Sequence, residues 1–454
     1  MTESQTDGSL IDHLTFDSQA ETSYQAVTTF SDGVLTREMQ LGEIHATTQM
    51  EVGDLHKSEQ NDLDGCWWLG RIRGKEIRLL SGSHKGELVR SVDLFCGSGG
   101  FSLGVSAAAE ELGLKMKSMA AVDIDEHALE VFRANHAARI IRNCSVTDLV
   151  DYSVQKDAEN YSFFNTPEIV DEQFEKLVGR VELVLGGPPC QGHSNLNNHT
   201  RRNDPRNSLY ALVVVMAQAL GAKVALTENV QGVLRDHGDV VNLTKGLIET
   251  SGWSYDEAVL AADSLGWAQT RKRHFLCAWR DAKSDSGTSF NDVSEMLSHR
   301  SRPVSWLLSD LLEQPNTDEM FNKPSDLSDE NKARVAQLFE ADEYTLRDQY
   351  RPVSHQNGNT YPSSYGRLHW DQPSGTITTG FLTPGRGRFI HPTQPRGLTP
   401  HEGARLQGYP DVFRFSIESG KVTRSLLAKW IGDAVPMPLG YAAGMVALSR
   451  VVSG

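Results

Sequence analysis

The chain has 454 residues, of which 39% are hydrophobic and 23% are charged, as in folded globular proteins. No apolar run approaches the roughly 20 residues that a membrane-spanning helix requires, and the acidic, polar start lacks the basic and apolar segments of a secretory signal. These features favour a cytoplasmic protein without a membrane partner. The five cysteines are odd in number and form no CxxC pair, which argues against a disulfide framework and a metal site.

The net charge of −15 argues against nucleic-acid binding only if the charge is spread evenly along the chain. Acidic residues gather in the first 65 positions and between positions 310 and 343, whereas basic residues cluster elsewhere. A local basic face can bind phosphates on an acidic protein. The basic clusters are Arg201, Arg202 and Arg206; residues 271–274; and Arg367, Arg386, Arg388 and Arg396.

The first 88 residues differ in character from the rest of the chain. Residues 1–64 are acidic and polar without a clear hydrophobic period, which predicts a mostly disordered extension. Residues 65–88 contain two short strand-like runs around Gly74 and predict a β-like element with a hairpin.

An alternation of strands and helices follows over residues 89–280. Apolar runs predict strands at 91–95, 118–124, 138–146, 181–185, 223–228, 255–262 and 274–279. Helices are expected at 101–112, 126–139 and 207–220, and residues 151–180 form an insertion with one helix. This order predicts an α/β fold with a doubly wound, mostly parallel sheet.

Residues 281–370 break the alternation and predict a smaller inserted domain, with helices near 303–313 and 327–340. Residues 371–454 return to the core. There, residues 399–402 (TPHE) form a capping box that opens a helix ending at Gln407, and an apolar helix runs to Val452.

The most specific segment is residues 186–194 (GGPPCQGHS), directly after the predicted strand 181–185. Its prolines stiffen the turn, and its glycines let a substrate approach closely. A lone cysteine is more often a buried packing residue. On such a turn, Cys190 is instead a candidate nucleophile.

Residues 93–100 (DLFCGSGG) join the first strand of the alternation to its first helix, where small residues let a cofactor approach backbone N–H groups. Asp123 ends the next strand and is placed to accept ribose hydroxyls. A dinucleotide site, an S-adenosylmethionine site and tight helix–strand packing all fit this pattern.

Two further features have both a functional and an ordinary interpretation. Glu228 ends a strand in TENV, so its carboxylate is expected in the cleft of the sheet, although a salt-bridged glutamate fits equally well. Residues 269–273 (QTRKR) are either part of the site or an exposed basic turn.

The order of these motifs resembles the carbon-5 cytosine methyltransferase family over about residues 90–280 and 365–454. The motifs that carry the resemblance are DLFCGSGGFSLG (93–104), GGPPCQGHS (186–194), DPRNSL (204–209), TENV (227–230), QTRKRHF (269–275), RGLTPHEGARLQGYPD (396–411) and IGDAVPMPLG (431–440).

The resemblance implies a covalent mechanism on double-stranded DNA. The Cys190 thiolate adds to cytosine carbon 6, so that carbon 5 can attack the methyl group of S-adenosylmethionine. Glu228 bonds ring nitrogen 3 and the exocyclic amine, while Arg271 and Arg273 favour the thiolate and bind the cytosine carbonyl. The target base must be flipped out of the duplex, at a cost of a few kcal/mol.

The resemblance also implies which residues contact the cofactor and the DNA. The cofactor contacts are Phe95, Gly97, Ser98, Gly99, Gly100, Asp123, Ile124, Ser145, Val146, Pro188, Leu209, Ala434 and Val435, with Asp123 on the ribose and Ile124 on the adenine. The DNA contacts in the catalytic segment are Gln191, Ser194, Arg201, Arg202 and Arg206.

Residues 281–370 correspond to the target-recognition region of the family. Candidate base readers there are Arg351, His355, Gln356, Asn357 and Arg367, with ordinary loop polarity as the alternative. The chain departs from the family pattern at Ser145 (usually aspartate), Ile124 (commonly aromatic), His193 (usually phenylalanine) and Asp433 (usually asparagine).

The sequence therefore predicts a DNA cytosine methyltransferase of prokaryotic or phage origin, with a cognate restriction endonuclease as a candidate partner. The same chemistry on RNA is an alternative, but the long variable region does not resemble the compact tRNA-methylating branch. A third hypothesis is a catalytically silent DNA-binding relative of the family, which the complete cysteine motif disfavours.

Overall fold

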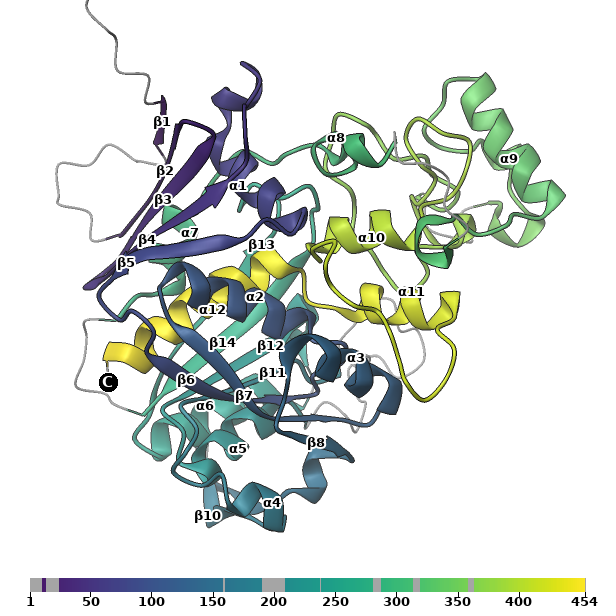
Figure 1. The fold of residues 1–454 in the computed structure, drawn as a ribbon. Coiled ribbons are helices and arrows are strands. Elements are labelled where there is room, and N and C mark those ends of the chain that lie inside the picture. The colour runs from purple at the N-terminus through teal and green to yellow at the C-terminus, as the bar shows by residue number, and fades with distance from the viewer. Residues whose placement is uncertain are drawn as a thin grey trace, which may run out of the picture.

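The computed structural model describes residues 10–13, 24–157, 160–189, 209–236, 238–280, 287–312, 319–357 and 363–453. A seven-stranded sheet runs through the centre with helices on both faces, and a five-stranded antiparallel sheet packs beside it (Figure 1). The remaining part of the chain, with α8, α9, α10 and α11, lies to one side (Figure 1).

The central sheet confirms the predicted α/β class. Its strand order is β13-β14-β12-β11-β6-β7-β8, in which β14 pairs antiparallel with both β12 and β13 and the other pairs are parallel. The strands are β6 (Leu88–Leu94), β7 (Lys115–Asp123), β8 (Ile140–Asn143), β11 (Leu183–Gly186), β12 (Val224–Asn229), β13 (Ser254–Ala261) and β14 (Lys272–Trp279).

The two faces of the sheet are covered by different helices. One face packs against α2 (Gly100–Glu111) and α12 (Met437–Ser453), and the other against α5 (Leu212–Leu220) and α6 (Val240–Thr250). Gly104 lets α2 and α12 touch, because a Cβ there would lie 2.6 Å from the Met437 carbonyl oxygen. This contact returns the C-terminal segment to the core.

No single helix in the described part of the chain is long and apolar enough to cross a membrane. α11 (Arg424–Asp433) and α12 reach that length and composition only as a pair bent by 41°. α12 is buried from Met437 to Val451, as expected of a core helix.

The insertion after β8 contains more strand than the sequence predicted. β9 (Val150–Asp157) and β10 (Asn160–Ile169) form an antiparallel hairpin, followed by the one expected helix, the short α4 (Glu172–Glu175). The sequence analysis also missed α6 and α11, whereas α3 (Glu126–His136) agrees with its predicted position.

The N-terminal segment corrects two expectations. The disordered extension predicted for residues 1–64 is wrong for 24–51, and the hairpin predicted near Gly74 is instead a helix followed by a strand. The antiparallel sheet comprises β1 (Leu10–His13), β2 (Tyr24–Ser31), β3 (Val34–Leu41), β4 (Ile44–Glu51) and β5 (Ile77–Gly82), with α1 (Leu63–Ile72) between β4 and β5. The inward face of β3 includes a buried arginine, Arg37, and this disguised the alternating pattern.

Buried charge joins this N-terminal sheet to α2 and α12. Arg37 pairs with Asp64 of α1, and its Nε lies 3.1 Å from the carboxylate of Glu111 at the end of α2. Glu111 also accepts hydrogen bonds from Trp67 Nε1 at 2.7 Å and from the hydroxyl of Tyr441 at 2.5 Å. Removing one partner would leave an uncompensated buried charge, so the sheet is fixed to α2 and α12.

The lateral part holds its own small core of Val335, Leu338, Leu346, Tyr365 and Ile390. In chain order, the helices of this region are α7 (Phe290–Met296), α8 (Val304–Leu308), α9 (Asp329–Glu340) and α10 (Pro400–Gln407). The predicted capping box is present, since Thr399 and Glu402 make both reciprocal bonds.

A buried histidine in this part predicts sensitivity to acid. The Nδ1 atom of His391 accepts the backbone N–H groups of Thr393 at 3.2 Å and Gln394 at 3.1 Å, so protonation there breaks both bonds. Burial lowers the pKa of His391 from 6.5 to about 4. The stabilising contribution of the neutral ring is therefore complete above pH 6.5 and is lost as the pH falls towards 4, up to about 3 kcal/mol.

The measurement is the melting temperature against pH for wild type and His391→Asn, which keeps an acceptor but cannot be protonated there. We expect a shallower loss of stability between pH 6.5 and 4 in the variant. Equal slopes for the two proteins would contradict this account.

Candidate active site

The predicted nucleophile follows a segment that lies beside Glu228. A Cβ on Gly187 would lie 3.2 Å from Glu228 Oε2, and the Asn229 side-chain amide donates to the Pro188 carbonyl at 3.3 Å. Cys190 directly follows Pro189, the last described residue of this segment. Outside the described residues lie Cys190, Gln191, His193, Ser194, Arg201, Arg202 and Arg206.

Glu228 and Arg273 meet as a buried ion pair at the carboxyl end of β12. Arg273 Nε lies 2.8 Å from Glu228 Oε1, and both side chains are largely covered. Burial raises the pKa of Glu228 above its usual range, although the charges of Arg273, Arg271 and His274 oppose that shift. A carboxyl group with a raised pKa keeps its proton to a higher pH than an exposed glutamate, so Glu228 is suited to act as a proton donor.

Arg271 lies on the same strand face but is tied to the backbone. Its Nη1 donates to the carbonyl oxygens of Ile377 at 2.7 Å and Gly432 at 3.0 Å, and the side chain is buried. The start of β14 is thus joined to the lateral part and to the end of α11.

The turn between β6 and α2 has the backbone of a ligand-binding loop. Phe95, Gly97 and Gly99 have φ angles of 54°, 51° and 93°, so the backbone curls in the left-handed region. Asp123 holds it by accepting the N–H groups of Gly97 and Asp125, both at 2.9 Å. A Cβ on Gly97 would meet nothing within 4 Å, so the turn faces open space.

A buried acceptor at the base of this turn fits a bound group. Asp93 accepts a hydrogen bond from Ser102 through one carboxyl oxygen, while its other oxygen is buried and has no partner among the described residues. Burial raises the pKa of Asp93 to about 8. With the open space at Gly97, this orphaned acceptor fits a polar cofactor at the carboxyl ends of β6 and β7.

The C-terminal segment closes against the same turn. Ser98 Oγ lies 3.1 Å from the hydroxyl of Tyr409 and donates to the Trp430 carbonyl at 3.3 Å. A Cβ on Gly100 would lie 2.7 Å from the Tyr409 hydroxyl and 2.9 Å from Ala434 Cβ. Residues some 330 positions apart in the chain therefore form one wall.

This close contact predicts that Gly100→Ala destabilises the fold by about 1–3 kcal/mol, because the added methyl group overpacks the wall. The matched control is Gly375→Ala, where a Cβ meets nothing within 4 Å and φ is ordinary. Melting temperatures of the two variants test the prediction. A Gly100 variant as stable as the control would refute it.

The remaining predicted cofactor residues differ in their exposure. Ile124 is 77% exposed, which leaves its side chain free to cover a flat ligand. Ser145 Oγ bonds Thr147 Oγ1 at 2.6 Å, Val146 is buried, and Leu209 and Val435 line the packed interior.

Sequence reasoning missed three residues of this region: Asp93, Tyr409 and Lys429. Lys429 Nζ lies 2.7 Å from Asp125 and 3.9 Å from Asp433, so a single cation bridges two carboxylates. Asp93 and Tyr409 lie inside the family motifs and could have been proposed, whereas Lys429 is on α11, a helix that the sequence analysis did not predict.

Two of the five predicted base readers, Gln356 and Arg367, differ in their surroundings. Gln356 is half-buried and donates to the Arg351 carbonyl at 2.8 Å. The guanidinium of Arg367 lies 4.2 Å from the Phe339 ring centroid and 4.9 Å from that of Tyr344, and bonds the Pro392 carbonyl at 2.8 Å. Its side chain is 11% exposed, so reading a base would require it to leave these contacts.

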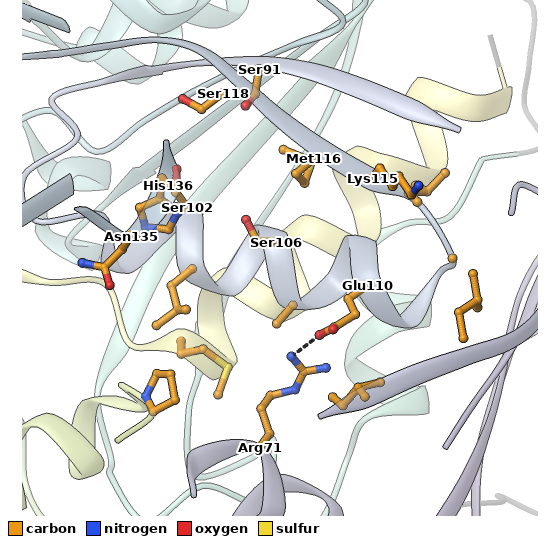
Figure 2. Close-up of a pocket in the computed structure, with 18 of the residues that line it drawn as sticks. Arg71, Ser91, Ser102, Ser106, Glu110, Lys115, Met116, Ser118, Asn135 and His136 are labelled. Atoms are coloured by element: carbon orange, nitrogen blue, oxygen red, sulfur yellow. Dashed lines mark hydrogen bonds and ion pairs between the residues drawn. The ribbon is translucent and has the colours of Figure 1, made fainter. Parts of the chain in front are cut away.

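A groove of about 990 Å³ lies between α2 and the strands β6 and β7, where Figure 2 shows four serines around it: Ser91, Ser102, Ser106 and Ser118. At one end, His136 bonds the Gly99 carbonyl at 3.0 Å. None of the predicted site residues lines this groove, which therefore lies behind the cofactor turn and outside the candidate site.

A sequence profile described as C-5 cytosine-specific DNA methylase matches residues 89–446. The chain belongs to this family. The match spans every predicted site residue, from Phe95 to Val435, and excludes the N-terminal sheet.

Individual relatives agree with this assignment. The type II methyltransferase M1.BsuMI of Bacillus subtilis is 39% identical over 359 residues, covering 78% of this chain and 79% of the relative. M.FnuDI of Fusobacterium nucleatum is 27% identical, covering 78% and 92%. The fold is similar to that of a DNA modification methyltransferase from an E. coli prophage, with a TM-score of 0.53, 24% identity and coverage of 81% and 100%. The C-5 cytosine methylase described here is a DNA (cytosine-5-)-methyltransferase of the type II kind.

Proposed function

We propose that the enzyme transfers a methyl group from S-adenosylmethionine to carbon 5 of a flipped cytosine within a short specific sequence of duplex DNA. The observation that carries this proposal is the buried Glu228–Arg273 pair beside the segment leading to Cys190. It supplies a proton donor and a fixed cation next to a nucleophile.

The protein groups act in order. The Cys190 thiolate forms a bond from Sγ to cytosine carbon 6, and Glu228 delivers a proton to ring nitrogen 3, so that the ring electrons collect at carbon 5. S-adenosylmethionine, when bound, supplies an electrophilic methyl group to carbon 5. The donor would leave as the neutral thioether S-adenosylhomocysteine. Loss of the carbon-5 proton to water then restores the ring double bond and breaks the bond to Cys190, which leaves as thiolate, and ring nitrogen 3 returns its proton to Glu228. Arg273 and Arg271 balance the negative charge of Glu228 and of the thiolate.

The cofactor would be held along the carboxyl ends of β6 and β7. The curled turn from Phe95 to Gly100 offers backbone N–H groups, Asp123 is placed for ribose hydroxyls, and Ile124 for the adenine face. The unpartnered oxygen of Asp93 adds an acceptor that a cationic ligand would satisfy.

DNA binding is proposed to involve both halves of the protein. Gln191, Ser194, Arg201, Arg202 and Arg206 would contact the substrate near the flipped base. Residues 281–370 would form the target-recognition domain, with Gln356 and Arg367 as candidate readers. The type II relatives support a restriction–modification context with a cognate endonuclease, and the DNA substrate supports action in the cytoplasm of a bacterium.

The test is transfer of labelled methyl from S-adenosylmethionine to unmethylated duplex DNA, with tRNA in parallel. We expect label on DNA alone, and bisulfite sequencing then locates the target sequence. Label on tRNA alone would move the substrate to RNA, and no label on either would contradict the proposal.

A further inference from the structure

A chain of four polar side chains lies directly behind Glu228 and Arg273. The hydroxyl of Tyr210 lies 3.2 Å from Nδ1 of His274, whose Nε2 lies 3.1 Å from Glu257. Glu257 in turn pairs with Lys245 of α6. Tyr210 and His274 are each 1% exposed, so their contact is made out of solvent, whereas the Glu257 and Lys245 side chains are partly exposed.

The direction of these hydrogen bonds follows from charge. Bonds from His274 and Lys245 lower the pKa of Glu257 to about 2, so it is a carboxylate that can only accept. His274 therefore donates through Nε2, which leaves Nδ1 as the ring atom that faces the Tyr210 hydroxyl. Burial and the carboxylates of Glu257 and Glu228 raise the pKa of Tyr210, which keeps it protonated as a donor.

Strand geometry couples this chain to the candidate site. Arg273 and His274 are consecutive in β14, so their side chains leave opposite faces of the sheet. Arg273 reaches Glu228 on one face, while His274 reaches Tyr210 and Glu257 on the other. In the pairing of β12 with β14, His274 lies opposite Asn229, the residue after Glu228.

Tyr210 anchors the other end of the chain. It packs with Val233, Val240 and Val241, which belong to the segments that follow β12. It also directly follows Leu209, one of the proposed cofactor contacts. The hydroxyl of one tyrosine thus ties the segment just before α5 to the start of β14.

We propose that Tyr210, His274, Glu257 and Lys245 form a positioning relay that fixes the start of β14 from its far face and so sets the geometry of the Glu228–Arg273 pair. The relay rests on the proposed function of that pair. Its members act through Arg273 and Glu228 and do not touch the substrate. A displacement of about 1 Å far from the reacting atoms can cost about 100-fold in rate, so partial loosening should be measurable.

The experiment is a single-turnover measurement on full-length protein with DNA and S-adenosylmethionine prebound. Tyr210→Phe removes one hydroxyl, and we expect the rate constant to fall about tenfold with little change in melting temperature or in either dissociation constant. His274→Ala should lose a similar factor, and the double variant no more than either alone, because the residues act as a unit.

Two conservative variants divide the relay. The side-chain amide of His274→Asn can take the place of Nδ1 and hold Tyr210, whereas that of His274→Gln can reach towards Glu257 in the place of Nε2. Each should recover part of the rate lost in His274→Ala. Tyr152→Phe, on the distant strand β9, is the matched control and should leave the rate constant unchanged.

The outcomes separate the alternatives. If the residues had a purely structural role, the variants would lower the melting temperature or the amplitude of the single turnover, which measures the fraction of active enzyme. The rate constant would not change, and this result would overturn the relay. Additive losses in the double variant would also overturn it. An inactive wild type would contradict the proposed function itself, and the relay with it.

Discussion

Replacing Cys190 with serine is expected to reduce methyl transfer to DNA by more than about 1,000-fold, while binding of S-adenosylmethionine stays within twofold of wild type. The hydroxyl of serine is a far weaker nucleophile than a thiolate, so the bond to cytosine carbon 6 does not form. The readout is labelled methyl on duplex DNA, with donor binding measured by calorimetry on the same preparations.

A trapping experiment tests the covalent step by itself. DNA containing 5-fluorocytosine cannot lose a proton from carbon 5, so the protein–DNA bond should persist on a denaturing gel for wild type and be absent for Cys190→Ser. Cys144→Ser is the matched control, because Cys144 is a free, partly exposed cysteine near the predicted adenine pocket. Activity retained by Cys190→Ser would contradict the mechanism.

The sequence predicted the parts of the fold whose residues are patterned locally. Apolar runs marked the strands of the central sheet, and the Thr399–Glu402 capping box marked the start of α10. The cofactor turn was predictable because glycines at positive φ leave a trace in the sequence. The resemblance to the cytosine methyltransferase family then indicated that motifs far apart in the sequence belong to one site, which no local pattern could indicate.

Features built from long-range partners could not be predicted in this way. Arg37 looked like a surface residue, yet Asp64 and Glu111 make it an interior one, and the strand around it was missed. Likewise, nothing local indicates that Gly100 touches Tyr409, or that His274 meets Tyr210 across the sheet. Such partners are set by tertiary packing.

The difference between local patterns and long-range partners also applies to the candidate active site. Glu228 and Arg273 come from neighbouring antiparallel strands, so their pairing follows from the register of β12 and β14. Arg271 has the same residue type and strand face as Arg273, but the segments around Ile377 and Gly432 engage it. The motif predicted two equivalent arginines, whereas the structure gives one contact to Glu228 and one to the backbone.

Replacing Glu228 with glutamine is expected to lower kcat about 100- to 10,000-fold, the range attributed to a positioned general acid. The amide keeps the size and hydrogen-bonding reach of the carboxyl group but cannot deliver a proton to ring nitrogen 3. It also leaves Arg273 without its buried partner, so donor binding and melting temperature must be measured together with the rate. Glu38→Gln, on an exposed position of β3, is the matched control and should retain wild-type activity.

The pKa of Glu228 also predicts how the rate of methyl transfer changes with pH. Burial raises the pKa of Glu228, so its protonated, proton-donating form persists to higher pH than in an exposed glutamate. The rate of the step that uses this proton should fall as the pH rises through that raised pKa, whereas thiolate formation at Cys190 favours the opposite direction. Wild type is therefore expected to give a bell-shaped profile. Glu228→Gln should lose the alkaline descent and keep the acid limb, and a variant that retained both limbs would assign the descending one to another group.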